Sequence, residues 1–400
     1  MLDRATIERI KGPVVIALSG GGDSVALLHL LAAECGPARL RALVVDHALR
    51  HGSAADAGRA AGFAAALGVR AEILTLDWPA GRPRAQQAAR EARYRALCDA
   101  TRGMDAGAIC VAHTADDQAE TVFMRAAGGS AWRGLASMPP VAPAPVWPQG
   151  RGVVLVRPLL DVRRIVLRDF LRARGAEWID DPANSNEAFE RVRARARLAA
   201  LERAGFDPLR LARLARRLRA RAEALDREAL ELIARAARFD GARIALAPTK
   251  WSGALETRRR SLSVLVTAAS GSAREPQLAA VERLEARLGQ ESFRGAALGG
   301  ARLRRRGVEV WIERDPGALL GRADGTPGVA ALALAAGAET VWDGRLALHA
   351  LAPGWRIEAE ADGPVIVKGD QRIVAAEMDR AGFQPIWLLE LRVRALLHAS

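Results

Sequence analysis

Two clusters of polar residues near the N-terminus have the side-chain types and the spacing of a catalytic site. The first, SGGGDS at residues 19–24, lies between an apolar run at 14–18 and an apolar helical pattern at 25–31. A glycine-rich turn between a strand and a helix points several backbone N–H groups at one spot, where the helix dipole adds a positive field. Such a turn binds phosphate. Asp23 brings a carboxylate to this anion site, which is favourable mainly when Mg²⁺ lies between them.

The second cluster, HTADDQAET at residues 113–121, follows another apolar run. Asp116, Asp117 and Glu120 place three carboxylates within one helical turn, with Asp116 expected near the N-cap and the other two on one face. Like charges at this spacing require a compensating cation, which is either Mg²⁺ or an ammonium substrate. A capping box of Asp117 and Glu120 would explain those two residues without a ligand, but it would leave His113 and Asp116 unexplained.

Alternating strand and helix patterns surround both clusters. Strands are expected at residues 14–18, 42–45, 70–76, 108–112 and 153–156, and helices at 53–67, 86–100, 116–126 and 161–173. This alternation predicts an α/β fold with a parallel, doubly wound sheet. Ligands bind at the carboxyl ends of strands in such sheets. Asp46-His47 and both clusters follow strands, so we expect all three segments to converge on one edge of the sheet.

The remainder of the chain predicts smaller helical and α+β domains. Residues 128–152 lack periodicity and are expected to form a long loop. Residues 191–221 hold eleven arginines at helical spacing, which favour either an RNA-binding face or a solvated one. The predicted organisation is a catalytic domain at 1–205, an RNA-contacting helical and α+β domain at 206–316, a Gly- and Ala-rich linker at 317–340 and a small, reduced C-terminal domain at 341–400.

The composition restricts the class of protein. The net charge is +13, nearly all from arginine, which favours a nucleic-acid partner or reflects a GC-rich genome. The sequence has no apolar run of about 18 residues and no signal-peptide pattern, so no membrane association is expected. The three cysteines form no C-x-x-C motif, which is typical of a reducing compartment, and we expect a cytoplasmic protein.

The motifs carry a resemblance to a known family. SGGGDS resembles the PP-loop of ATP pyrophosphatases, which split ATP between the α and β phosphates and adenylate a substrate oxygen. Over about residues 13–197 the chain resembles tRNA(Ile)-lysidine synthetase, through SGGGDS at 19–24, VDHALR at 45–50, AREARY at 89–94, HTADDQAET at 113–121, RPLL at 157–160 and WIDDPANSN at 178–186. The resemblance implies a carbon–nitrogen ligase. ATP adenylates the C2 oxygen of the wobble cytidine in tRNA(Ile) with a CAU anticodon, and L-lysine then displaces AMP to give lysidine.

The resemblance also implies roles for individual residues. ATP is expected to bind Ser19, Gly20, Gly21, Gly22, Asp23, Ser24, Asp46 and His47. The implied catalytic residues are Asp23, Asp116, Asp117 and Glu120, with Mg²⁺ at Asp23 and Asp116 and lysine at Asp117 and Glu120. Contacts with tRNA or phosphate are expected from Arg50, Arg90, Arg93, Arg191 and Arg195.

Two other functions stay open at this point. A tRNA 2-thiolase of the PP-loop class often uses paired cysteines or an iron–sulfur cluster, and Cys35, Cys98 and Cys110 offer no such pairing. A non-catalytic RNA-binding protein would account for the basic charge, but it would not need the acidic residues beside an intact glycine loop. No protein partner is implied.

Overall fold

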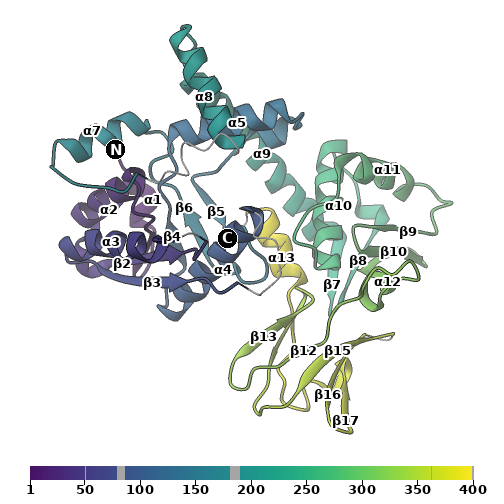
Figure 1. The fold of residues 1–400 in the computed structure, drawn as a ribbon. Helices are drawn as coiled ribbons and strands as arrows, with labels where there is room; N and C mark the ends of the chain where they lie inside the picture. Colours follow the sequence, from purple (N-terminus) through teal and green to yellow (C-terminus); the bar gives the residue numbers. More distant parts are fainter. Residues whose placement is uncertain (50, 79–85, 181–189, 362, 399–400) are drawn as a thin grey trace. The chain divides into compact units, whose positions relative to one another are not determined.

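The computed structural model describes residues 1–49, 51–78, 86–180, 190–361 and 363–398 of the 400-residue chain. They form two compact units, unit 1 (Met1–Ala222) and unit 2 (Glu223–Ser400), and each unit has hydrophobic cores of its own. Unit 1 runs from purple to teal in Figure 1, and unit 2 runs from green to yellow. Both polar clusters belong to unit 1.

The described part of unit 1 contains a six-stranded sheet with the order β3-β2-β1-β4-β6-β5. Neighbouring strands are parallel except for β5, which pairs antiparallel with β6. The strands are β1 (Val14–Ala17), β2 (Leu40–Asp46), β3 (Arg70–Thr75), β4 (Ala108–Cys110), β5 (Val141–Pro143) and β6 (Val154–Val156). The helices are α1 (Arg4–Glu8), α2 (Gly22–Cys35), α3 (Ser53–Ala66), α4 (Gln86–Gly103), α5 (Ala115–Ala127), α6 (Trp132–Leu135), α7 (Arg164–Arg172), α8 (Glu190–Arg203) and α9 (Leu209–Ala236).

This sheet is covered on both faces. Val14 and Ile16 of β1 pack in one core with residues of α2, α3 and α7, whereas Val15 and Ala17 pack in a second core with residues of α4. Successive side chains of a strand point to opposite faces, so a strand buried on both sides must be apolar throughout. The predicted doubly wound parallel fold is confirmed.

The carboxyl ends of β1, β2 and β4 lie at one edge of the sheet. In the register of the parallel pairs, Ala17 lies beside Leu43 and Ile16 lies beside Cys110. The SGGGDS loop follows β1, Asp46 ends β2, and HTADDQAET follows β4. The alternation of strands and helices therefore brings three distant segments to the same edge.

The segment 128–152 differs from the expected loop, because it contains α6 and β5. These elements have only four and three residues, too few to produce a periodic pattern in the sequence. Gln118 of α5 holds the turn between them. Its amide donates to the Met138 carbonyl at 2.7 Å, and its carbonyl oxygen accepts from Ser137 Oγ at 2.7 Å and from the Met138 N–H at 3.0 Å.

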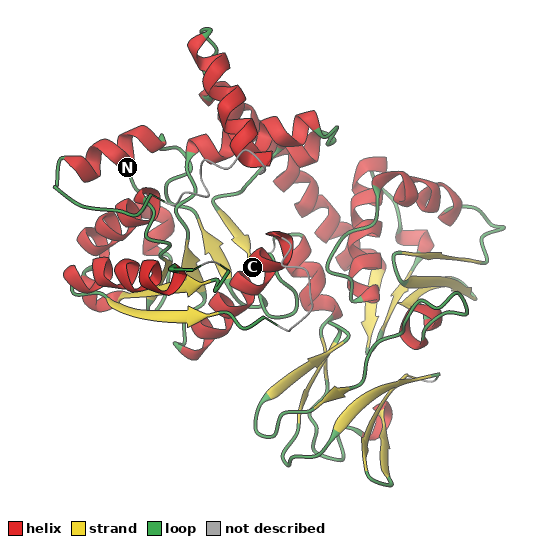
Figure 2. Ribbon diagram, viewed as in Figure 1, coloured by secondary structure: helices red, strands yellow, loops and turns green. Residues whose placement is uncertain are grey.

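Unit 2 is rich in strands, as the yellow ribbons of Figure 2 show. In its described residues the sheets have the orders β7-β8-β11-β10-β9, β12-β15-β16-β17 and β13-β14-β18. The strands are β7 (Ala237–Asp240), β8 (Arg243–Leu246), β9 (Gly295–Leu298), β10 (Ala301–Arg306), β11 (Glu309–Arg314), β12 (Leu332–Ala333), β13 (Glu339–Trp342), β14 (Leu346–His349), β15 (Arg356–Glu360), β16 (Gly363–Lys368), β17 (Gln371–Val374) and β18 (Ile386–Trp387). The helices are α10 (Leu255–Ser270), α11 (Leu278–Leu288), α12 (Pro316–Leu320) and α13 (Leu389–Leu396).

The predicted linker at 317–340 contains most of α12, all of β12 and the first residues of β13. Leu319 and Leu334 are buried in one core with Trp342. The segment is mostly alanine and glycine, so its few large apolar residues do not form a visible pattern. The two compact units divide inside α9, whereas the sequence placed a boundary after 205; the finer division into domains stays a prediction. Among the described helices, none combines the length and the hydropathy needed to span a bilayer.

Candidate active site

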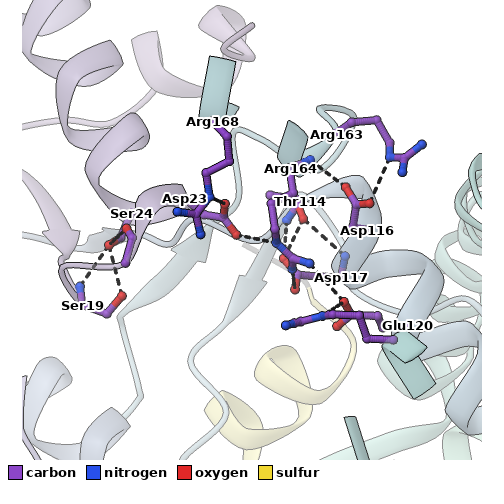
Figure 3. Close-up of polar contacts among 12 residues, drawn as sticks. Ser19, Asp23, Ser24, Thr114, Asp116, Asp117, Glu120, Arg163, Arg164 and Arg168 are labelled. Atoms are coloured by element: carbon purple, nitrogen blue, oxygen red, sulfur yellow. Dashed lines mark hydrogen bonds and ion pairs between the residues drawn. The ribbon is translucent and has the colours of Figure 1, made fainter. Parts of the chain in front are cut away.

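The SGGGDS loop is held by its two serines (Figure 3). The Ser19 N–H donates to Ser24 Oγ at 3.3 Å, the two hydroxyl oxygens are 3.1 Å apart, and Ser24 Oγ donates to the Gly21 carbonyl at 2.8 Å. Helix α2 begins at Gly22, and its N-cap, Gly21, has no side chain to accept from the first N–H groups. The N-terminus of α2 is therefore a place where phosphate oxygens can accept those hydrogen bonds.

One of the three glycines is required by its backbone conformation. Gly20 has φ +80°, and a Cβ there would lie 2.6 Å from Ile179 Cδ1. A Cβ on Gly22 would meet the guanidinium of Arg168, the end of a flexible side chain that can move aside. A Cβ on Gly21 would meet only Ser19 Oγ, at 3.6 Å, so the protein's own packing does not require a glycine there. An approaching ligand is a sufficient reason for that glycine.

The carboxylates at the start of α5 are arranged differently from the sequence expectation. The N-cap is Thr114, and its capping box pairs it with Asp117: Thr114 N–H and Oγ1 donate to Asp117 Oδ2 at 2.7 and 2.8 Å. The alternative reading of a capping box between Asp117 and Glu120 is wrong by this geometry, whereas Asp116, in the first turn of α5, lies near the N-cap as expected. Asp117 Oδ1 and the Glu120 carboxylate face other partners.

Arg164, which the sequence analysis did not single out, joins the two clusters. Its Nε donates to Asp23 Oδ2 at 2.9 Å, its Nη2 to Asp117 Oδ1 at 2.8 Å and its Nη1 to Glu120 Oε1 at 3.3 Å. Arg163 and Arg164 stand at the N-terminus of α7, where the helix dipole disfavours cations. Two arginines at such a position are a sequence signal that carboxylates lie opposite.

Two of the predicted phosphate-binding arginines also contact these carboxylates. Arg191 Nη2 donates to Asp117 Oδ1 at 2.8 Å and its Nε to Glu120 Oε2 at 2.7 Å. Arg195, one turn along α8, donates to Glu120 Oε1 at 2.9 Å. The Glu120 side chain is 2% exposed, so a buried carboxylate lies among guanidinium groups from two helices.

The carboxylates differ in their electrostatics. Burial raises the pKa of Asp117, but Arg191 and Arg164 outweigh it, and the net pKa lies below the usual value. For Asp23, burial raises the pKa despite the opposing charge of Arg164, and the net pKa lies above the usual value. Asp23 Oδ1 is buried and has no hydrogen-bond partner among the described residues. The protein itself thus compensates the charge of Asp23 less than that of Asp117.

Asp116 has a different position from the other three acids. Its Oδ1 accepts from Arg163 Nε at 3.0 Å, and its Oδ2 accepts from the backbone N–H of Arg164 at 2.7 Å. Arg164 is the first residue of α7, so Asp116 caps this helix from a neighbouring element. Both oxygens are occupied, and the structure therefore favours a positioning role over the predicted Mg²⁺ ligation.

We expect Asp116→Ala to reduce the free energy of unfolding by about 1–2 kcal/mol, because it removes the cap of α7. Urea unfolding measures this change. The matched control is Asp161→Ala, which removes an exposed carboxylate paired with Arg216 at 3.3 Å and should have little effect. If Asp116→Ala kept full stability and lost only metal-dependent activity, the capping role would be contradicted.

Asp46 and His47 end β2 at the same edge of the sheet. Asp46 Oδ1 accepts from the Ala48 N–H at 2.9 Å, and the His47 carbonyl accepts from Trp78 Nε1 at 2.7 Å. The Asp46 side chain is buried, and its bond to Ala48 supports a backbone with φ +49°. Arg50, the next predicted contact, lies outside the described residues.

The predicted contacts on α4, Arg90 and Arg93, have neighbours other than the carboxylates. The Arg90 guanidinium lies 5.0 Å from the centroid of the Tyr94 ring in its own helix. Burial lowers the pKa of His47, and the charge of Arg93 lowers it further. The imidazole of His47 is therefore neutral at pH 7, and its buried Nδ1 has no partner among the described residues.

His113 is a second buried imidazole. Burial lowers its pKa to about 3, against the opposing charge of Asp117. Its Nδ1 also has no hydrogen-bond partner within the described part of the chain. Neutral imidazoles at the ends of β2 and β4 can hydrogen-bond an uncharged polar group, such as a nucleobase edge, without adding charge.

One carboxylate of this site could hold a metal ion. Within the described ranges, no group of three or more His, Cys, Asp or Glu side chains is arranged to hold one. Asp23 Oδ1 is buried, accepts no hydrogen bond from a described residue and lies 4.0 Å from Arg168 Nε, so it fits a cation that takes its other ligands from phosphate and water. Magnesium bound to nucleotides commonly uses one or two protein carboxylates in this way.

Comparison with known proteins shows which family this chain belongs to. The family model of a PP-loop domain matches residues 2–202. The tRNA(Ile)-lysidine synthase of Hyphomonas neptunium is 40% identical over 313 residues, which cover 77% of this chain and 83% of that protein. The enzyme of the same name from Ruegeria pomeroyi is 37% identical over 96% of this chain and 84% of its own length. By these matches, the chain belongs to the tRNA(Ile)-lysidine synthase family.

Proposed function

We propose that this protein is the ligase that forms lysidine on tRNA(Ile) with a CAU anticodon. The C2 oxygen of the wobble cytidine attacks the α-phosphorus of ATP, and pyrophosphate leaves. The amine of L-lysine then attacks C2, a C–N bond forms, the C2–O bond breaks, AMP leaves with that oxygen, and the amine loses a proton. The observation that carries the proposal is the three-way contact of Arg164, which places the phosphate loop beside the buried acids Asp117 and Glu120.

The loop accounts for the adenylation step. The N-terminus of α2 and the hydroxyls of Ser19 and Ser24 would bind the phosphates, and Asp23 would hold Mg²⁺ through Oδ1, which accepts no hydrogen bond from a described residue. The ion, when bound, neutralises charge on the departing pyrophosphate. Arg164 and Arg168 lie beside Asp23, where their charge would stabilise the leaving group.

Asp117 and Glu120 would bind the second substrate, L-lysine. Asp117 and Glu120 already bind cations, since their oxygens accept from guanidinium groups at 2.7–3.3 Å. A lysine ammonium needs the same acceptors. Lysine would therefore compete with Arg191 and Arg195 for these oxygens, and the arginines would move to phosphates of the nucleotide or tRNA.

We expect Glu120→Gln to raise the KM for lysine by about 100-fold while changing the KM for ATP little, because a buried charge partner of the amine is lost. Steady-state assays with each substrate varied in turn measure the difference. The matched control is Glu202→Gln, which alters a half-exposed carboxylate paired with Arg163 at 3.2 Å. Equal increases in both KM values would indicate a metal or folding role for Glu120 instead.

The cysteines do not support the thiolase alternative. Burial raises the pKa of both Cys98 and Cys110 to about 12, so neither forms a thiolate at neutral pH. The decisive assay for the proposal combines purified protein, ATP, labelled lysine and a tRNA(Ile) transcript. We expect label in the RNA and one AMP released per lysine incorporated. AMP release without incorporation, or sulfur transfer in its place, would contradict the proposal.

A further inference from the structure

The five-stranded sheet of unit 2 carries arginines around a tryptophan on one face. We call this surface the arginine face; it consists of Trp311 with Arg238, Arg243, Arg302, Arg304 and Arg306. The strand register places Arg304 directly opposite Trp311, Trp311 opposite Ala245, and Ala245 opposite Arg238. Residues directly opposite in a sheet share a face, so this row crosses four strands on one side.

The other face of the same sheet is the core of the unit. Leu303, Ile312 and Ile244 alternate with the residues of the arginine face and are fully buried in one cluster with residues of α10. Helix α10 contacts β8, β10 and β11 (Figure 1). Trp311 belongs to none of the hydrophobic clusters of the described residues, and it is half-buried. A large aromatic ring on the side of a sheet away from its core calls for a partner other than the core.

The immediate neighbours of Trp311 are cations. The guanidinium carbons of Arg238 and Arg306 lie 5.7 and 5.6 Å from its ring centroid. Arg304 is exposed, and in the described part of the chain it has neither an ion pair nor a hydrogen bond from its side chain. A ring flanked by guanidinium groups presents the two chemistries that unpaired nucleotides need, a stacking surface and phosphate donors.

The acids on this face are fewer and already paired. Glu313 is buried and accepts from Arg302 at 2.7 Å and lies 3.4 Å from Arg243. Asp240 lies 3.4 Å from Arg238, and Glu309 lies 4.0 Å from it. Five arginines thus face three carboxylates, which leaves an excess positive charge around the tryptophan. This excess complements a polyanion and disfavours a basic partner or a second copy of the same face.

We infer that the arginine face binds RNA, with an unpaired base stacked on Trp311 and the neighbouring phosphates held by the arginines. The inference rests on the proposed function in one respect, namely that the substrate is tRNA. It adds a binding surface in unit 2, separate from the carboxylate site in unit 1. Stacking is tolerant of sequence, so this surface supplies affinity more than base recognition.

The test uses the full chain and a tRNA(Ile) transcript, with the dissociation constant measured at several salt concentrations. Trp311→Ala should weaken binding about 10-fold or more with the salt dependence unchanged, and Trp311→Phe should restore most of it. Arg304→Glu should weaken binding and reduce the slope of log Kd against log salt by about one. Arg380→Glu, an equally exposed arginine of unit 2, is the matched control for charge and should do neither.

Lysidine formation at saturating tRNA separates this inference from the proposed function. If kcat is unchanged in all four variants and the affinity for tRNA is reduced in Trp311→Ala and Arg304→Glu, the result supports both the RNA-binding role of the arginine face and the proposed function. Normal tRNA affinity in those two variants would show that the arginine face does not bind RNA, and it would leave the proposed function standing. A wild-type chain that binds tRNA and never incorporates lysine overturns the proposed function and leaves the binding result standing. Urea unfolding of each variant checks that a loss of affinity is not a loss of fold.

Discussion

Asp23→Asn is expected to abolish the release of AMP and pyrophosphate, by at least about 10³-fold in kcat/KM, while the fold stays intact. The substitution keeps the size of the side chain and removes its charge. That charge is the reason for the loss, because Asp23 Oδ1 is a buried carboxylate oxygen that accepts no hydrogen bond from a described residue and could therefore hold Mg²⁺. Ser24→Ala should act in the same direction, since Ser24 Oγ holds both Ser19 and the Gly21 carbonyl.

Asp23→Asn is expected to be as stable as the wild-type protein. Burial raises the pKa of Asp23, so its ionised form is costly in the folded protein, and a neutral amide should not lower the free energy of unfolding. The matched control is Asp169→Asn, an exposed carboxylate of α7 paired with Arg172 at 2.8 Å. Product release at a near wild-type rate in Asp23→Asn would exclude the SGGGDS loop as the site of ATP cleavage.

Arg164→Ala is expected to lower the free energy of unfolding by about 3 kcal/mol at pH 7, because it leaves three carboxylates with one fewer cation. Asp117 and Glu120 keep Arg191 and Arg195 as partners, which limits the loss. The control is Arg172→Ala in the same helix, where the pair with Asp169 is exposed on both sides and the change should be below about 1 kcal/mol.

The effect of Arg164→Ala should also depend on pH. The folded pKa of Asp117 is lowered, so its ion pairs contribute stability above its unfolded pKa of about 4 and lose it as pH falls through the folded value. The difference between wild type and variant should therefore be largest near pH 7 and shrink below about pH 4. Urea unfolding at a series of pH values measures it. A difference that grew on acidification would mean that Arg164 does not stabilise ionised carboxylates.

Local patterns were enough to predict most of unit 1. The apolar runs of β1, β2 and β4 are continuous because both faces of the sheet are buried. The polar segments that follow these strands can be identified in the sequence without the structure. In unit 2, local apolar patterns predicted fewer of the strands. Short strands and an alanine-rich segment carry too few large apolar side chains to show a period, so β12 and the buried Leu334 were placed in a linker.

The sequence by itself determined the parallel sheet, the glycine-rich loop and the edge at which the polar segments meet, because alternating strands and helices imply a parallel sheet whose strands all end at the same edge. Only the tertiary structure decided which charges pair. Arg164 is 141 residues from Asp23 and 47 from Asp117, and Arg191 is 71 from Glu120. No periodicity links residues so far apart, since the packing of α7 against α2 and of α8 against α5 selects the partners. For the same reason the sequence suggested Asp116 as a metal ligand, whereas the folded chain uses both of its oxygens on Arg163 and the first turn of α7.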